Sequence, residues 1–350
     1  MTDNRQTPSF TVIGAPAITQ VLESAADLVV ALINQAYAMH GRGETVNPTS
    51  LFFRPPGMPG SRIIALPAAV QGDAPAIGLK WISSFPGNLA DGLPRASAVL
   101  VLNDPRTGFP VACLESSVIS ATRTAASAVL AAGYLSADRP RNRVGFVGTG
   151  LIATYVQRYL TAQGWPQQST LVHDLDAGRA RRFADRLAQA GHGDVRVRAS
   201  AEDVVRSSDV VVFATTAATP YLLDPAVFAH HPLVLHLSLR DLGTAVILSS
   251  VNVVDDREHC LREHTSVHLA AMESGDASFL TATIPDVLAG SYRPRPQETV
   301  VVSPFGLGVL DIVLADFVFR ETVAKGLVTV EPDFFHGAGA AALPSKPAER

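Results

Sequence analysis

The residues best suited to bind a cofactor form a glycine-rich turn near the middle of the chain. Gly148 and Gly150 are followed by Ala153, directly after the apolar run 144–147 and before a segment of helical periodicity. The first glycine allows a tight turn, the second lets a diphosphate approach the backbone, and the small third residue lets the helix pack closely. The N-terminus of the helix would stabilise the diphosphate charge. An ordinary strand-to-helix turn can use the same glycines, so the surrounding sequence has to decide.

A carboxylate follows at the position expected for binding ribose. Asp174 ends the next apolar run and lies 24 residues after Gly150. A carboxylate there accepts hydrogen bonds from the ribose hydroxyls of NAD and repels the 2′-phosphate of NADP. Strand, turn, helix and carboxylate occur in the required order, so the sequence predicts an NAD site. Three arginines within 179–182 could weaken the preference for NAD, or could belong to a solvated helix face.

Three cations lie in apolar segments of the first 125 residues. Lys80 sits in a run that is apolar on both faces, Arg54 stands between an apolar run and two prolines, and Arg123 is the only charge between Glu115 and Asp138. A buried cation needs an anionic partner, either a protein carboxylate or a ligand. Structural ion pairs and snorkelling side chains explain such residues equally well. Together the cations suit the carboxylate of an amino or keto acid.

Asp241 is the candidate acid–base residue. It follows the apolar run 233–237, and ligands bind at the carboxyl ends of strands in a parallel sheet. It could accept a proton from an attacking water. It could equally cap a helix or pair with the neighbouring Arg240.

These residues need two kinds of sheet to position them. The first part of the chain has a helical pattern over 25–39, followed by short runs typical of a mostly antiparallel sheet, at 50–54, 62–69, 76–85 and 96–103. A cluster of turn residues between 98–102 and 109–114 predicts a hairpin. A small-residue helix over 118–135 would bridge to the second part.

Strands alternating with helices then predict a doubly wound parallel sheet. Its strands are expected at 144–147, 170–173, 195–197, 210–213, 233–237, 252–254 and 299–302. An apolar helix over 307–325 could return to the first lobe. We therefore predict an α/β protein with a Rossmann-type NAD-binding domain over 126–309. A mostly antiparallel α+β substrate and dimerisation domain takes 10–125 and 310–335, and residues 336–350 form a disordered tail.

Composition excludes several classes of function. The 350 residues are 47% hydrophobic and 17% charged, with a formal net charge of −4. No basic cluster indicates nucleic acid or an anionic membrane, so we expect a small-molecule partner. Without a secretory signal or an apolar span of about 18 residues, the protein is expected in the cytoplasm. Cys113 and Cys260 are expected to be reduced, and no side-chain spacing predicts a metal site; the doublet His230–His231 fits a loop.

The segment 120–127, with the hairpin before it and the glycine turn after it, resembles the ornithine cyclodeaminase and μ-crystallin family. The resemblance covers about residues 10–330. Four segments look most like its 2,3-diaminopropionate biosynthesis branch, namely 59–67, 78–86, 92–97 and 304–311. Members of that branch are N-(2-amino-2-carboxyethyl)-L-glutamate dehydrogenases, which serve siderophore and peptide antibiotic pathways.

The resemblance implies roles for particular residues. Arg54, Lys80 and Arg123 would hold the substrate carboxylate, with Ser97 nearby, and Asp241 would activate water. Lys80 would also stabilise charge or assist proton transfer. The residues expected to line the cofactor are Gly148, Thr149, Gly150, Leu151, Ile152, Ala153, Asp174, Thr215 and Ser238.

In the implied reaction, hydride passes from the glutamate α-carbon to NAD, and water releases 2-oxoglutarate and L-2,3-diaminopropionate. The cyclodeaminase branch has an acidic residue within the segment matching 62–67, and its absence here argues against ornithine. The alternatives are an ornithine or lysine cyclodeaminase, a ketimine reductase, an opine or alanine dehydrogenase, and a non-catalytic ligand-binding protein. The family also suggests a homodimer formed through the first lobe.

Overall fold

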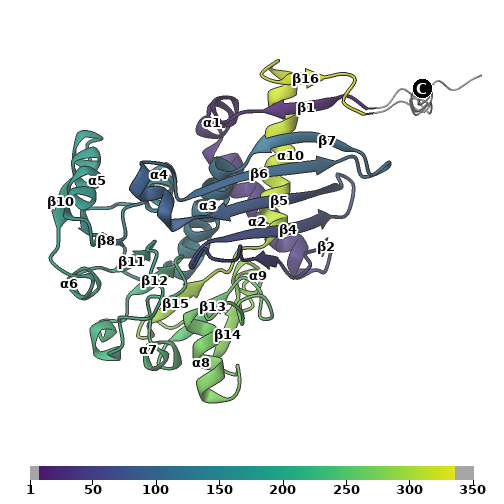
Figure 1. Ribbon diagram of the computed structural model, residues 1–350. Coiled ribbons are helices and arrows are strands. Elements are labelled where there is room, and N and C mark those ends of the chain that lie inside the picture. Colours follow the sequence, from purple (N-terminus) through teal and green to yellow (C-terminus); the bar gives the residue numbers. More distant parts are fainter. Residues whose placement is uncertain (1–7, 336–350) are drawn as a thin grey trace, which may run out of the picture.

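The computed structural model describes residues 8–335, which form two sheets joined by helices (Figure 1). The predicted disordered tail, 336–350, lies outside these residues. The sheet that we call sheet A has the order β16-β1-β7-β6-β5-β4-β2, with β3 also paired to β4. Its strands are β1 (Phe10–Ile13), β2 (Thr45–Val46), β3 (Leu51–Phe53), β4 (Arg62–Val70), β5 (Ala76–Ser84), β6 (Ala96–Asn103), β7 (Pro110–Glu115) and β16 (Thr329–Glu331).

Sheet A is antiparallel except where β1 runs parallel to β7, which confirms the predicted character of the first lobe. The predicted hairpin joins β6 to β7. Its turn is fixed by Asp104, whose Oδ1 accepts the backbone N–H groups of Arg106 and Thr107. Such a carboxylate closes the turn without tertiary contacts, which is why the hairpin could be predicted from the local sequence.

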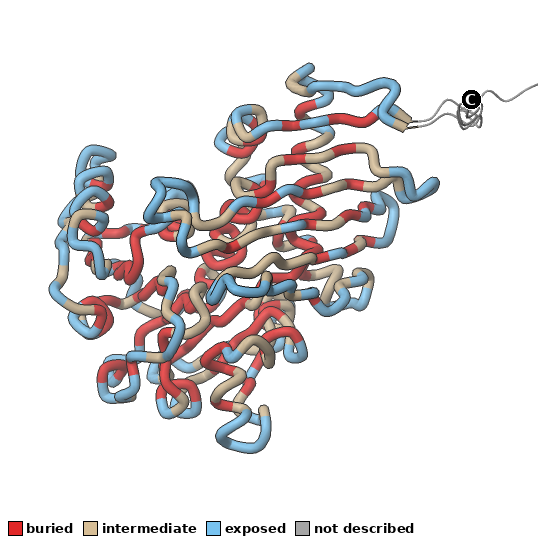
Figure 2. The backbone as a smooth tube through the Cα atoms, viewed as in Figure 1, coloured by how far each residue is buried: buried red, intermediate tan, exposed pale blue. Residues whose placement is uncertain are grey.

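Helices cover one face of sheet A: α1 (Ala15–Glu23), α2 (Ala26–Gly41), α3 (Ser117–Leu135) and α10 (Gly308–Ala324). Helix α10 packs against β4 and β5, so the late helix does return to the first lobe. Helix α3 is long and apolar enough to cross a membrane, but 72% of its apolar window is buried inside the protein. Figure 2 shows this burial where α3 passes behind the strands. The helix is therefore part of the protein core.

Sheet B is fully parallel, in the order β10-β9-β8-β11-β12-β15-β13-β14. Its strands are β8 (Arg143–Val147), β9 (Ser169–His173), β10 (Asp194–Val197), β11 (Val210–Phe213), β12 (Leu233–His236), β13 (Val251–Val254), β14 (Leu280–Thr283) and β15 (Val300–Ser303). The central strands β11, β12 and β15 are buried at every position, as expected for a sheet covered on both faces. The predicted doubly wound sheet is confirmed.

The remaining helices lie between or beside these strands. They are α4 (Leu151–Ala162), α5 (Ala177–Gln189), α6 (Ala201–Arg206), α7 (Thr244–Leu248), α8 (Ser266–Ser274), α9 (Ile284–Leu288) and the short 3-10 helices η1 (Pro86–Asp91) and η2 (Pro225–Phe228). Sheet A uses residues from both ends of the chain and sheet B uses the middle. The exact domain boundaries given above stay a prediction.

Candidate active site

The glycine turn lies between β8 and α4 and has the shape that a diphosphate needs. Gly148 has φ +86°, and a Cβ there would lie 2.6 Å from the carbonyl oxygen of Ala214, so no larger residue fits. Gly150 faces open space, with no atom of the described residues within 4 Å of a Cβ built on it. Within residues 8–335, no side chain caps the N-terminus of α4 at Gly150. The first backbone amides of the helix are therefore free to bind an anion. Ala153 is fully buried, as close packing of the helix requires.

Asp174 holds this turn in place. The N–H and the hydroxyl of Thr149 each donate to its Oδ2 at 2.8 Å, and the N–H of Asp176 donates to Oδ1 at 3.0 Å. A carboxylate offers about four acceptor positions, so roughly one remains for a ribose hydroxyl. Leu151 is exposed and Ile152 is half-buried at the start of the helix. The turn and its carboxylate therefore fit a dinucleotide.

A second cluster is buried between sheet A and α10. Lys80 Nζ lies 2.6 Å from Asp311 Oδ2, and Arg123 Nε lies 3.1 Å from Oδ1 of the same carboxylate. The Lys80 ammonium also donates to the hydroxyl of Ser120 at 3.3 Å. The sequence left open whether a protein carboxylate or a ligand neutralises these cations, and the structure shows a protein carboxylate. Two cations share one carboxylate, so the cluster keeps a net positive charge for a further anion.

The loop before α10 shapes the space around Arg123. Gly306 has φ +105°, and a Cβ there would lie 2.8 Å from the Nη1 atom of Arg123. The N–H groups of Phe305 and Gly306 donate to the two oxygens of the buried Asp255, at 2.9 and 2.6 Å. Burial raises the pKa of Asp255, and these backbone hydrogen bonds oppose the rise. The guanidinium therefore lies against bare backbone that is fixed by Asp255.

Burial also lowers the pKa of Lys80, from 10.5 to about 8. The attraction of Asp311 raises this pKa and the repulsion of Arg123 lowers it further. At neutral pH the amine is mostly protonated, but it lies near its titration point. Lys80 can therefore hold a carboxylate or exchange a proton in the physiological range.

Asp241 has no exposed surface and is surrounded by donors. Its Oδ1 accepts hydrogen bonds from the hydroxyls of Thr215, at 2.5 Å, and Tyr221, at 3.0 Å. Its Oδ2 accepts a hydrogen bond from the hydroxyl of Ser238 and lies 3.2 Å from His236 Nε2. Burial alone would raise the pKa of Asp241, but His236, Ser238 and Thr215 outweigh it and hold that pKa below its ordinary value. The predicted residues Thr215 and Ser238 are thus brought together by an anionic Asp241 at the carboxyl ends of β11 and β12.

The structure does not bring Ser97 and Lys80 together. Lys80 pairs with Leu100 across β5 and β6, and Ser97 is three residues from Leu100, so it points to the opposite face of sheet A. Its hydroxyl contacts that of Ser83 at 2.8 Å, away from Lys80. Arg54 is not part of the ion-pair cluster of Lys80, Asp311 and Arg123. It pairs with Glu263, and its side chain is 58% exposed.

Residues 19–326, most of the chain, match the model of the ornithine cyclodeaminase/mu-crystallin family. The chain belongs to this family. Its sequence is 28% identical over 311 residues to N-((2S)-2-amino-2-carboxyethyl)-L-glutamate dehydrogenase of Staphylococcus aureus, covering 85% of this chain and 90% of the relative.

Two solved structures share the fold of this family member. Delta(1)-pyrroline-2-carboxylate reductase of Thermococcus litoralis, with NADH and L-proline, superposes with a TM-score of 0.84 at 22% identity, covering 91% of this chain and 99% of that one. An archaeal alanine dehydrogenase dimer with bound NAD gives a TM-score of 0.83 at 23% identity, covering 93% and 100%. At these identities the likeness establishes the fold.

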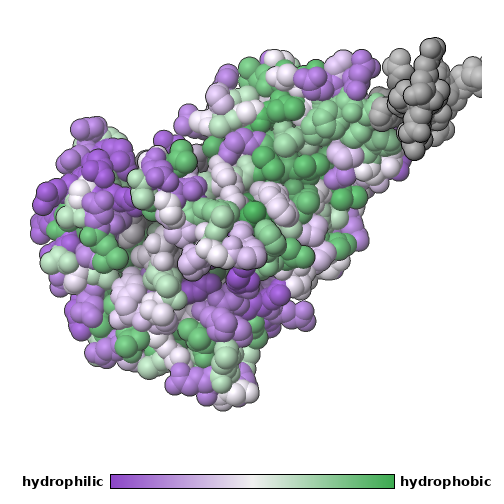
Figure 3. All heavy atoms as spheres, viewed as in Figure 1, coloured by the Kyte–Doolittle hydropathy of each residue, from purple (hydrophilic) through white to green (hydrophobic). Residues whose placement is uncertain are grey.

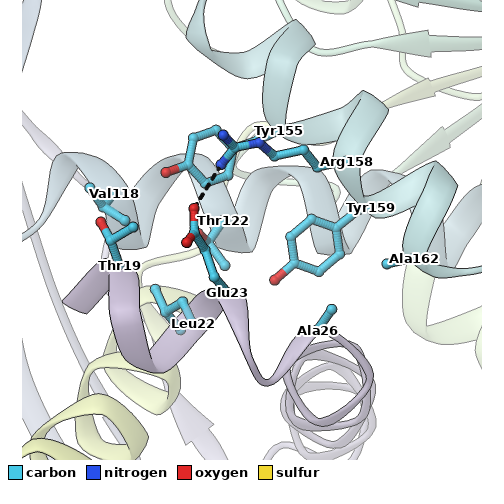
Figure 4. A pocket seen from close by; sticks show the side chains of 10 residues that line it. All are labelled: Thr19, Leu22, Glu23, Ala26, Val118, Thr122, Tyr155, Arg158, Tyr159 and Ala162. Atoms are coloured by element: carbon cyan, nitrogen blue, oxygen red, sulfur yellow. Dashed lines mark hydrogen bonds and ion pairs between the residues drawn. The ribbon is translucent and has the colours of Figure 1, made fainter. Parts of the chain in front are cut away.

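The cavity drawn in Figure 4 lies apart from these groups of residues. It has a volume of about 230 Å³ and lies between α1, α2, α3 and α4. Its lining residues are Thr19, Leu22, Glu23, Ala26, Val118, Thr122, Tyr155, Arg158, Tyr159 and Ala162. The catalytic candidates Lys80 and Asp241 are absent from this lining, so the cavity is not the candidate active site.

Sequence reasoning missed the role of Asp311. The residue occurs in a segment that carried the family resemblance, but nothing local marks it as the partner of Lys80, which is 231 positions away. A single acidic residue in the apolar stretch 307–315 was the available signal. An isolated charge in an apolar helix needs a partner as much as Lys80 and Arg123 do.

Proposed function

We propose that this protein oxidatively cleaves N-(2-amino-2-carboxyethyl)-L-glutamate to L-2,3-diaminopropionate and 2-oxoglutarate in the cytoplasm, within a siderophore or peptide antibiotic pathway. It is an NAD-dependent enzyme that acts on the CH–NH group of an amino acid. The observation that carries the proposal is the buried Lys80–Asp311–Arg123 cluster with its net positive charge. Arg123 lies on α3, which packs against α4, the helix that begins at the glycine turn.

The proposed reaction converts the conjugate, NAD⁺ and water into 2-oxoglutarate, L-2,3-diaminopropionate, NADH and a proton. NAD, when bound, supplies the acceptor for hydride from the glutamate α-carbon. Lys80 and Arg123 hold the carboxylate beside that carbon and stabilise charge there. Asp241 is anionic and accepts a proton from the water that attacks the oxidised carbon. Its hydroxyl donors can rotate away, which gives water access to one carboxylate oxygen.

The decisive experiment is incubation of the purified protein with the conjugate and NAD. We expect absorbance at the NADH wavelength to rise together with 2-oxoglutarate detected by mass spectrometry. A cyclodeaminase would instead release ammonia from ornithine or lysine without net NADH. Absence of 2-oxoglutarate, with NADH formed from another amino acid, would refute this substrate and leave a dehydrogenase of different specificity.

The pKa of Lys80 predicts how binding depends on pH. We expect the affinity for 2-oxoglutarate, titrated in the presence of NADH, to fall as pH rises through about 8, because the neutral amine no longer attracts a carboxylate. In a Lys80→Arg variant the side chain stays protonated, so the fall near pH 8 should be absent. If the affinity of the wild type for 2-oxoglutarate rises as pH increases through 8, the protonated form of Lys80 is not the form that binds the keto acid.

We also propose that the protein is a homodimer formed through the open face of sheet A. Trp81 and Val99 form a cross-strand pair on that face, each 42% exposed, and Ile77, four residues before Trp81 on the same face, is 38% exposed. Figure 3 shows apolar side chains gathered over the strands of this sheet. An apolar surface of this kind is typical of a protein–protein interface.

A Trp81→Glu variant should sediment as a monomer where the wild type sediments as a dimer, because two charges would be buried at the symmetric contact. The control is Met272→Glu on α8, which is 61% exposed and distant from sheet A. Monomeric wild-type protein at micromolar concentration, or a dimeric Trp81→Glu variant, would refute this interface.

A further inference from the structure

We propose that Arg62, Arg95 and Arg240 form a specificity site for the substrate carboxylates that lie away from the reacting carbon. The inference rests on the proposed function, because it concerns the same substrate. It assigns the substrate class, amino acids carrying one or two additional carboxylates, to residues that the motifs did not identify. Arg54 and Glu263 border the site.

Two of these arginines lie at the end of sheet A that follows Lys80. Arg62 begins β4 and pairs across the strands with Ser84, the last residue of β5. The Nη1 group of Arg95 donates to the Ser84 hydroxyl at 2.6 Å. Because both contact Ser84, the guanidinium groups of Arg62 and Arg95 lie near each other at this corner of the sheet.

The register puts Arg62 on the same face of the sheet as Lys80. Arg62 pairs with Ser84 and Leu66 pairs with Lys80, with three paired rows between them. Side chains alternate along a strand, so the side chains at both ends of this four-residue span project to one side of the sheet. Four residues along a strand span about 13 Å. That separation, shortened by two long side chains, suits a ligand with carboxylates several bonds apart.

The third arginine comes from the other sheet. Arg240 follows β12 and donates from Nη2 to the carbonyl oxygen of Glu263 at 2.6 Å. The Glu263 carboxylate pairs with Arg54. Burial, followed by repulsion from Arg240 and Arg95, lowers the pKa of Arg62, while Glu263 opposes this and Arg54 adds to it. Arginines from both sheets therefore act on one another at this site.

The charges at this site do not balance. Four arginines and one glutamate give a net charge of +3 among the described residues of the group. The Nε atom of Arg62 is buried and has no hydrogen-bond partner within residues 8–335. A buried donor without a partner is rare in native proteins, and like charges held together need an anion. A carboxylate fits, because a guanidinium binds it through two parallel hydrogen bonds.

The backbone around the site is also strained. Leu239, Glu263 and His264 have φ values of +71°, +58° and +51°, in a region that non-glycine residues seldom adopt. They lie next to Arg240 and at its hydrogen-bond partner. Strain of this kind is kept where a site requires a fixed geometry.

The proposed substrate supplies the missing charge. Beyond the carboxylate beside the reacting carbon, the conjugate carries the γ-carboxylate of its glutamate half and the carboxylate of its diaminopropionate half. Two carboxylates would offset most of the net charge of the arginine group. Lys80 and Arg123 would then recognise any amino acid, while the arginine group would select acidic ones.

The test compares a dicarboxylate with a monocarboxylate by calorimetry in the presence of NADH. Wild-type protein should bind 2-oxoglutarate at least tenfold more tightly than pyruvate, because hydrogen bonds to charged groups contribute at about that level. Arg62→Met should remove most of that difference by weakening 2-oxoglutarate binding alone. Arg62→Lys should be intermediate, because a lysine keeps the charge but loses the bidentate geometry.

The matched control is Arg106→Met in the β6–β7 turn, which should bind both keto acids as the wild type does. Melting temperature and NADH binding show whether each variant is folded. Equal wild-type binding of the two keto acids, or Arg62→Met weakening both alike, overturns the inference. Binding of either keto acid is measured without turnover. If 2-oxoglutarate binding depends on Arg62 but the conjugate is not cleaved, the proposed reaction is refuted and this site is not.

Discussion

Replacing Asp311 by asparagine should lower the free energy of unfolding by about 3–5 kcal/mol, the usual result of removing one partner from a buried ion pair. The carboxylate has no exposed surface and contacts Lys80 and Arg123, which are themselves buried or nearly so. Asparagine has the same shape but carries no charge, so two cations would face each other without an anion. Urea denaturation followed by circular dichroism measures the loss.

The matched control lies on the same helix. Asp316 pairs with Arg320 near the surface, at 2.9 Å, and Asp316→Asn should change stability by at most about 1 kcal/mol. The double variant Lys80→Met, Asp311→Asn should recover part of the loss, because it removes one of the two unpaired cations. Equal stability of Asp311→Asn and Asp316→Asn would mean that Asp311 does not compensate these cations.

Most of the fold could be predicted because its signals are local. The central strands of sheet B are continuous apolar runs, and the hairpin between β6 and β7 carries its own turn residue, Asp104. Strands β1 and β16 could not be predicted in this way. They have four and three residues, and they form by pairing with each other and, for β1, with β7. Their stability comes from contacts between distant parts of the chain.

The same distinction applies to the candidate site. The glycine turn and Asp174 lie close together in sequence, and the structure joins them directly through Thr149. The ion-pair cluster depends on Asp311, from the far end of the chain, so the sequence predicted the need for an anion but not its source. The expectation for Ser97 came from the family resemblance, and the register of the strands was not predictable from the local sequence. The structure places Ser97 on the face of sheet A opposite Lys80.

Asp241→Asn should reduce steady-state release of 2-oxoglutarate by a factor of about 10² to 10⁴ while NAD binding is retained. The wild-type carboxylate is held anionic by His236, Ser238 and Thr215, so it is ready to accept a proton at neutral pH. Asparagine can still accept hydrogen bonds from neighbouring hydroxyls but cannot take the proton. Measurement of 2-oxoglutarate release by mass spectrometry and fluorescence titration of NADH separate the two effects.

Stability provides a second measure of the same carboxylate. The folded state holds the pKa of Asp241 below its ordinary value, so the ionised group stabilises the fold above that ordinary value. This stabilisation is lost as pH falls through the folded-state pKa, and Asp241→Asn should lose less stability over that acidic range than the wild type. The control Asp224→Asn changes an exposed carboxylate that caps η2 and should leave turnover unchanged.

The two measurements distinguish a catalytic role from a structural one. If Asp241 only joined the ends of β11 and β12, the variant would lose stability and NAD binding together, and turnover per bound NAD would be preserved. Loss of turnover in a folded, NAD-binding variant instead requires that the carboxylate takes part in the reaction. Retained turnover in such a variant would contradict the assignment of Asp241 as the base and favour a water molecule activated by another group, such as Lys80 with its pKa of about 8.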